Sequence, residues 1–293
     1  MHFLILCILS STGIFLIFKI IYRKGLPSFP VIVINYLAAT LLGFALHPGS
    51  GSLPEVKQAG WLPVSVLIGV LFIVMFFVVA LSTRKAGISV TTVASKMSVI
   101  FPIVFSMMID PSDRLSVIKG SGIILALAGV GLTVYRPVSA GVDRKAIYLP
   151  LILFLGMGLV DSLVKYAQHH FVRDQDTALF GAVLFLNAFV SGLILLPFFP
   201  RYHRWFAKPV TWALGLLLGT VNFGSIYFIV RALNYTSRTG TGIDSSVVFG
   251  INNIGVVSLS VLAGLWIFRE RLLTWNQIGI ALSVIAILLF TLA

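Results

Sequence analysis

Residues 61–81 read WLPVSVLIGVLFIVMFFVVAL, a run without one charged side chain. A helix needs about 20 apolar residues to cross the hydrocarbon core of a bilayer, so this run is long enough to span a membrane. The whole chain has the same character: 58% of its 293 residues are hydrophobic, 10% are charged, and the mean hydropathy is +1.04. Soluble domains are about one quarter charged. The composition excludes a soluble domain and predicts a multi-pass membrane protein.

On both sides of this run, charged or turn-forming residues divide the chain into further apolar segments. None of the loops between them is long enough to fold as a soluble domain. We therefore predict an all-α membrane protein with ten transmembrane helices. The predicted spans are Phe3–Ile21, Pro30–Leu46, Trp61–Leu81, Ile88–Ile109, Val117–Tyr135, Ile147–Gln168, Ala178–Phe199, Val210–Leu233, Ile243–Phe268 and Trp275–Leu292.

The net charge of +12 bears on topology. On a soluble protein such a charge would indicate nucleic acid, but in a membrane protein it reflects topology and anionic headgroups, so no nucleic-acid partner is expected. Most Lys and Arg fall in the odd-numbered loops, for example at Arg23, Lys24, Arg201 and Arg204. By the positive-inside rule, those loops are cytoplasmic and both termini lie outside.

The two halves of the chain repeat each other. The Asp-Arg-Leu turn at Asp113–Leu115 precedes Gly122 by the same spacing that separates the Glu-Arg-Leu turn at Glu270–Leu272 from Gly279. We therefore expect a first five-helix repeat at residues 1–136, a linker at 137–143 and a second five-helix repeat at 144–293. An odd number of spans per repeat inverts one half relative to the other, and inverted repeats place substrate near the bilayer midplane at the repeat interface.

This pattern resembles the EamA-like branch of the drug/metabolite transporter superfamily. In that pattern each half closes its fourth helix with an acidic-Arg-Leu turn before a Gly-led fifth helix. Glu270–Leu272 matches best, whereas Asp113–Leu115 has Asp in place of Glu. The resemblance implies transport of a small metabolite across a bacterial inner (cytoplasmic) membrane, commonly export and sometimes proton-coupled. Members are usually drawn with both termini in the cytoplasm, which conflicts with the charge distribution.

Lys96 is the strongest candidate for a substrate-binding residue. A charge at the bilayer centre costs about 2.5–3.5 kcal/mol on insertion scales, so it needs a partner or a wet cavity. On a helical wheel Thr92, Ser95 and Lys96 share one half of the fourth span, which predicts that this half faces a cavity or another polar helix. Pro102 removes a backbone hydrogen bond and can free a carbonyl there. The opposite half is apolar: Val90, Val93, Met97, Ile100, Phe101 and Val104.

Amides in the second half are the next candidates. Asn252 and Asn253 lie in the ninth span, the repeat mate of the fourth. Such amides bind a polar ligand or hydrogen-bond neighbouring helices, and the sequence favours neither. Asn187, Asn222 and Tyr227 lie inside the seventh and eighth spans and would complete a polar cavity.

Asp161 and Lys165 recur at helical spacing in the sixth span. The simpler interpretation is an ion pair that lowers the insertion cost of both side chains. The alternative makes Asp161 a proton or cation site whose charge Lys165 or Lys96 modulates. The structural pair is favoured, because Lys165 lies near a helix end.

Inverted repeats and buried single charges argue against a structural scaffold, and no ring of like charges indicates the selectivity filter of a channel. A secondary transporter working by alternating access on a small polar, anionic metabolite fits best, and a flippase for a lipid-linked small head group is the alternative. An enzyme is not expected, because acids and histidines do not converge at one depth. No cofactor or metal is expected either, since one Cys and no His-Glu motif offer no ligand set. The partners expected are a small-molecule substrate and membrane lipid, with a monomer or a homodimer as the unit.

Overall fold

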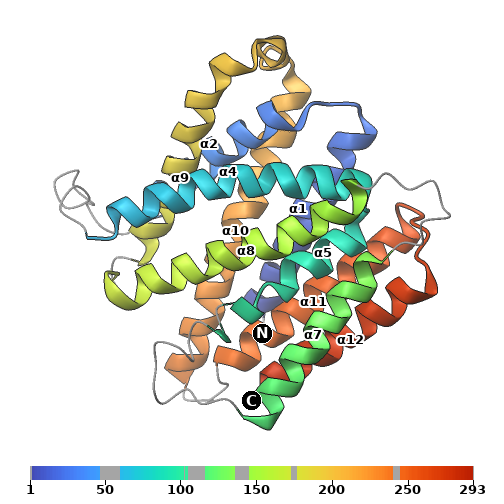
Figure 1. Ribbon diagram of the computed structural model, residues 1–293. Coiled ribbons are helices and arrows are strands. Elements are labelled where there is room, and N and C mark those ends of the chain that lie inside the picture. Colours follow the sequence, from blue (N-terminus) through green and yellow to red (C-terminus); the bar gives the residue numbers. More distant parts are fainter. Residues whose placement is uncertain are drawn as a thin grey trace. The chain divides into compact units, whose positions relative to one another are not determined.

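The computed structural model describes residues 2–46, 60–101, 103–104, 116–135, 145–172, 177–239 and 245–292. Within these ranges the chain is helical and contains no strand, which confirms the all-α prediction for them. The α-helices are α1 (His2–Arg23), α2 (Ser28–Ala45), α4 (Leu62–Lys85), α5 (Ile88–Met97), α7 (Val117–Val134), α8 (Lys145–His170), α9 (Thr177–Leu195), α10 (Pro209–Thr239), α11 (Ser245–Trp266) and α12 (Thr274–Leu292) (Figure 1). Each predicted span overlaps one of them.

Six helices in the described ranges are long and apolar enough to cross a bilayer. They comprise His2–Arg23, Ser28–Ala45, Leu62–Lys85, Val117–Val134, Leu179–Phe198 and Pro209–Ile229. Shorter apolar helices lie at Tyr148–Val164, Ile251–Trp266 and Thr274–Phe290. These lengths and compositions are those of a multi-pass membrane protein.

The chain forms two compact units whose boundaries lie inside helices. The first unit comprises Met1–Lys19, Val78–Gly158 and Gly224–Ala293, and the second comprises Ile20–Phe77 and Leu159–Phe223. Each unit therefore takes segments from both halves of the sequence. The compact units do not coincide with the division predicted at residues 1–136 and 144–293, and the predicted linker lies outside the described residues.

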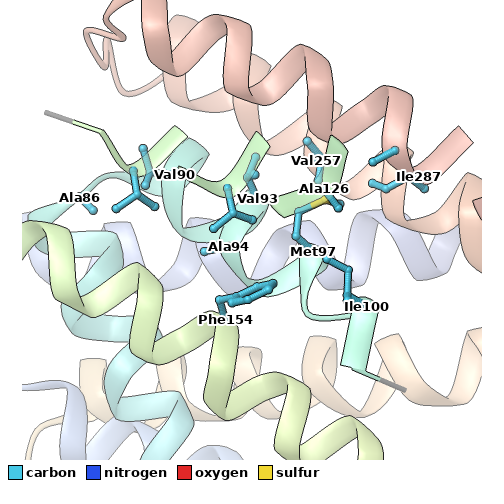
Figure 2. Close-up of a cluster of buried hydrophobic side chains, with 13 residues drawn as sticks. Ala86, Val90, Val93, Ala94, Met97, Ile100, Ala126, Phe154, Val257 and Ile287 are labelled. Atoms are coloured by element: carbon cyan, nitrogen blue, oxygen red, sulfur yellow. The ribbon is translucent and has the colours of Figure 1, made fainter. Parts of the chain in front are cut away.

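The core of the first unit forms around the apolar face of α5. As the helical wheel predicts, one side of this short helix is aliphatic and packs against α7, α8, α11 and α12 (Figure 2). The buried residues labelled in Figure 2 are Ala86, Val90, Val93, Ala94, Met97, Ile100, Ala126, Phe154, Val257 and Ile287. This packing fixes the rotation of α5, and with it the direction of its polar face.

Helices α7 and α12 pack closely and run antiparallel in the first unit (Figure 1). A Cβ on Gly129 would meet Ser283 and the carbonyl oxygen of Gly279, the latter at 3.0 Å, whereas Gly122, further back along α7, faces Phe290. Small residues on both helices thus let the two backbones approach. The side chain of Asn276 also donates to the Thr133 carbonyl at 2.8 Å and caps the end of α7.

The second unit has an aromatic core. Helices α2 and α9 run antiparallel, because Gly43 faces Ala182 whereas Gly192 faces Val33. The buried ring of Tyr36 lies 5.3 Å from the ring of Phe76 and 6.3 Å from that of Phe185. Its hydroxyl donates to the Phe72 carbonyl at 2.9 Å. Large flat rings fill this unit, and the polar end of Tyr36 is satisfied.

Candidate functional site

Lys96 lies at the end of a helix that is otherwise buried. Every residue of α5 is buried except Lys96, which is partly buried. The helix ends one residue later, at Met97: residues 98 and 99 form a turn, and helical geometry resumes at Ile100. The Ser98 hydroxyl donates to the Ser95 carbonyl at 2.6 Å, a local bond that competes with the helix ladder. The carbonyl end of a helix also favours a cation.

The predicted fourth span is therefore interrupted where a single helix at residues 88–109 was expected. The predicted role of Pro102 lies outside the described residues. Backbone that leaves the helix at membrane depth is tolerated only inside protein or beside a water-filled cavity. Breaks of this kind occur in the discontinuous helices that form ion and substrate sites in known transporters.

Polar groups of α1 lie near Lys96, although no motif in the sequence singles them out. The Lys96 ammonium lies within electrostatic range of the buried Cys7 thiol, and Ser11 lies within hydrogen-bonding reach of the same thiol. The same thiol donates to the Ser225 carbonyl of α10 at 3.2 Å. Cys7 and Ser11 are spaced one helical turn apart, and that spacing was the only sequence signal for them.

Thr92 and Asn252 offer buried polar atoms without a hydrogen-bond partner among the described residues. The Thr92 side chain is fully buried and Asn252 is 6% exposed, and their helices α5 and α11 pack together. An unsatisfied buried polar group costs about 1–3 kcal/mol. A polar ligand would satisfy the Thr92 hydroxyl and the Asn252 carbonyl oxygen. Ser95 is also buried, and Asn253 is partly buried.

Two predicted site residues belong to the second unit, where their amides already donate hydrogen bonds. The Asn187 amide donates to the Ser65 hydroxyl at 2.9 Å and ties α9 to α4. The Asn222 amide donates to the Asn35 side-chain oxygen at 3.1 Å and ties α10 to α2. Of the two roles open to buried amides, these contacts support helix packing.

The remaining predicted residues are placed as follows. Tyr227, in the first unit, accepts a hydrogen bond from Arg231 at 3.0 Å, and the Arg231 guanidinium lies 5.2 Å from the ring centroid. Asp161 is partly buried in the second unit. The side chain of Lys165 lies outside the described residues, so the predicted Asp161–Lys165 pair remains a prediction.

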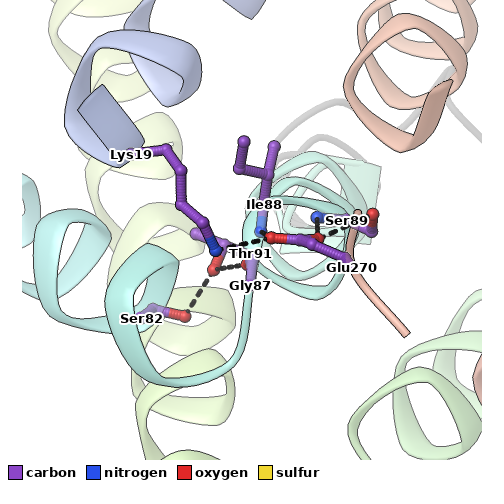
Figure 3. A network of polar contacts seen from close by, with 7 residues as sticks. All are labelled: Lys19, Ser82, Gly87, Ile88, Ser89, Thr91 and Glu270. Atoms are coloured by element: carbon purple, nitrogen blue, oxygen red, sulfur yellow. Dashed lines mark hydrogen bonds and ion pairs between the residues drawn. The ribbon is translucent and has the colours of Figure 1, made fainter. Parts of the chain in front are cut away.

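Glu270 organises the start of α5. Its carboxylate accepts from the Lys19 ammonium at 2.8 Å and from the Ile88 backbone N–H at 2.8 Å (Figure 3). It also accepts from the Ser89 N–H at 3.3 Å and the Ser89 hydroxyl at 3.2 Å. A helix N-terminus carries unpaired N–H groups and a partial positive charge, so one carboxylate here satisfies both the helix and Lys19.

This Lys19–Glu270 network positions the helix that holds Thr92 and Lys96. The Lys19 and Glu270 side chains are 13% and 10% exposed, so the ion pair is largely removed from water. Space is also limited: a Cβ on Gly264 would lie 2.8 Å from a Glu270 carboxylate oxygen. The Glu270–Leu272 turn makes Glu270 conspicuous in the sequence, but no local pattern pairs it with Lys19, although an ionic side chain inside a span is itself a signal that a partner exists.

Comparison with known proteins supports the fold over the whole chain. No family model matches it. An uncharacterized protein of Haemophilus influenzae (strain Rd) is 28% identical over 294 residues, covering 98% of this chain and 96% of that protein. A protein of known crystal structure matches with a TM-score of 0.58 at 16% identity, covering 98% of this chain and 96% of the other. At that identity the likeness shows the fold alone.

Proposed function

We propose that the chain is a secondary transporter that moves a small polar, anionic metabolite across a bacterial inner membrane by alternating access. The proposed direction is export, with coupling to protons, as the resemblance to EamA-like transporters implies. The proposed architecture is ten spans in two inverted five-helix repeats.

The pairing of helices supports the inverted repeats. The fifth and tenth predicted spans correspond to α7 and α12, which pack antiparallel. The second and seventh correspond to α2 and α9, which also pack antiparallel. Two repeats of opposite orientation bring equivalent helices together in this way, because each helix meets its inverted copy across the symmetry axis.

The observation that carries the proposed function is the polar set on α5 and α11 in the first unit. Lys96 supplies a positive charge beside a helix break, and Thr92 and Asn252 supply buried polar atoms that no described residue satisfies. An ammonium attracts a carboxylate or phosphate group, while a hydroxyl and an amide oxygen accept hydrogen bonds from the polar edges of a metabolite.

The first test is untargeted metabolite profiling of cells and medium, comparing wild type with Lys96→Ala at matched membrane abundance. We expect one class of anionic metabolite to accumulate in the medium only with the wild type. Lys96→Arg keeps the charge and should retain part of the export, whereas Lys24→Ala removes an exposed cation and should change nothing. Depletion from the medium would make the protein an importer.

Purified protein in proteoliposomes separates the transporter from the flippase. The metabolite found by profiling should move across the vesicle membrane with the wild type and not with Lys96→Ala. Wild-type transport by that variant would reject the role of Lys96. Movement of a labelled lipid head group between leaflets, without metabolite transport, would support the flippase instead.

A further inference from the structure

Residues 198–212 connect two helices that are each long enough to cross a membrane, and this connection is short. The flanking spans are Leu179–Phe198 and Pro209–Ile229, so the connection lies where the chain leaves one apolar helix and enters the next. It folds into two short 3-10 helices, η3 (Leu196–Phe198) and η4 (Pro200–Trp205). This position corresponds to the headgroup layer of a bilayer, where Trp and Tyr are enriched.

Three cations of this segment lie over its aromatic rings. The Arg201 guanidinium is 4.8 Å from the ring centroid of Tyr202. The Lys208 ammonium is 3.9 Å from that of Trp205, and the Arg204 guanidinium is 5.8 Å from the same ring. Arg201, Arg204 and Lys208 are all exposed. Each cation is thus held on a ring while its outer face stays open to an anion.

The Tyr202 ring is anchored in the second unit. Phe199 and Tyr202 pack on the buried ring of Phe29, with centroid distances of 5.1 and 5.9 Å. The Trp212 indole N–H donates to the Phe206 carbonyl at 2.7 Å and closes the segment onto α10. An anchored platform loses little conformational entropy when it binds a ligand.

No carboxylate close in the sequence compensates the positive charge of Arg201, Arg204 and Lys208. No Asp or Glu occurs between residues 177 and 243, and the described residues offer none of the three cations a carboxylate partner. Two exposed apolar side chains lie just before the three cations in the chain: Ile194 on α9 is 64% exposed, and Phe198 in η3 is 75% exposed. Positive charge, interfacial rings and an exposed apolar flank occur together.

We propose that residues 198–212 bind the headgroup of an anionic phospholipid, with the phosphate on Arg201, Arg204 and Lys208. The acyl chains would lie along Ile194 and Phe198. A soluble anion would use the cations but not this apolar flank, so the flank points to a lipid. Lys and Arg side chains near an anionic surface are attracted to it, and the aromatic rings beneath these three cations add a defined geometry.

The test uses the full-length protein in nanodiscs and native mass spectrometry with phosphatidylglycerol and phosphatidylcholine. We expect phosphatidylglycerol to bind preferentially, and the triple variant Arg201→Gln/Arg204→Gln/Lys208→Gln to weaken that binding at least fivefold. The control Arg23→Gln/Lys24→Gln/Arg84→Gln removes three exposed cations elsewhere and should stay within twofold of wild type. Equal binding by the triple variant and the wild type would overturn the proposal.

Two further measurements serve as controls for folding of the variant and for binding of a soluble anion. Thermal unfolding in phosphatidylcholine alone shows whether the triple variant is folded. If it is unfolded, Trp205→Leu is used instead. This change keeps all three charges and removes the aromatic ring under Arg204 and Lys208. Glycerol 3-phosphate is then added as a competitor without acyl chains. It should not displace the lipid, and efficient displacement would mean a site for a soluble anion instead.

Discussion

The two compact units differ in whether their buried polar side chains have hydrogen-bond partners. In the second unit the buried polar side chains Tyr36, Asn35 and Asn222 hydrogen-bond within the unit. In the first unit an ion pair holds the start of α5, while Thr92 and Asn252 leave buried atoms unsatisfied. Of the unsatisfied buried side-chain atoms in the described residues, all but that of Thr211 belong to the first unit.

In an apolar chain, this difference distinguishes buried polar side chains that stabilise helix packing from those that are candidates for ligand binding. A buried amide that donates to a neighbouring helix explains its own presence, because it stabilises the helix pair. A buried polar atom that no described residue satisfies costs free energy and therefore points to a ligand or an ordered water. The Asn187 and Asn222 amides of the second unit support the fold, and the unsatisfied atoms of Thr92 and Asn252 in the first unit are the candidates for function.

The largest effect is expected at Glu270. Glu270→Ala leaves the Lys19 ammonium without its carboxylate and the Ile88 N–H without its acceptor. Removing one partner of a buried ion pair costs about 3–5 kcal/mol. The measurement is the midpoint of thermal unfolding in detergent, with the double variant Lys19→Met/Glu270→Gln as control. The double variant should recover part of the loss, and unchanged stability of Glu270→Ala would show that the network does not hold α5.

Two glycines on α7 should respond in opposite directions. Gly129→Ala places a methyl group against Gly279 and Ser283 of α12, whereas Gly131 has nothing within 4 Å. Overpacking costs about 1–3 kcal/mol, while Ala in an open helical position gains up to about 1 kcal/mol over Gly. The unfolding midpoint should fall for Gly129→Ala and rise slightly for Gly131→Ala. Equal shifts would contradict the close contact between α7 and α12.

The same substitution in each unit tests the comparison directly. Asn222→Ala removes the hydrogen bond to Asn35, and such bonds between membrane helices contribute about 0.6 kcal/mol on average. Asn252→Ala removes an oxygen without a partner, so its stability cost should be smaller. Transport in proteoliposomes should show the reverse order, with Asn252→Ala the more impaired. A transport loss confined to Asn222→Ala would refute the assignment of the units.

The smallest effect on stability is expected at Thr92. Thr92→Val keeps the shape and removes a hydroxyl that has no partner among the described residues, so the unfolding midpoint should hardly move. Apparent substrate affinity should weaken several-fold. Thr40→Val is the matched control, because the Thr40 hydroxyl donates to the Tyr36 carbonyl at 2.7 Å and serves the second unit. Its transport affinity should be unchanged.

The sequence predicted the elements better than their assembly. Every predicted span overlaps a helix, because hydropathy and turn residues act over a few residues. The break after Met97 was missed, since it depends on the Ser98 side chain bonding locally rather than on hydropathy. Lys96, Thr92 and Asn252 were selected as polar residues inside apolar runs, whereas Cys7 and Ser11 resemble ordinary small residues of a membrane helix.

Hydropathy and turn residues alone predict an all-α membrane protein, the positions of its described helices, and which polar residues inside apolar runs require an explanation. Those properties follow from transfer free energies of consecutive residues. Only the tertiary structure decided which of the residues are paired. Lys19 and Glu270 are 251 residues apart, and Asn222 and Asn35 are 187 apart. Contacts over such separations are set by the packing of helices into units, which no local pattern specifies.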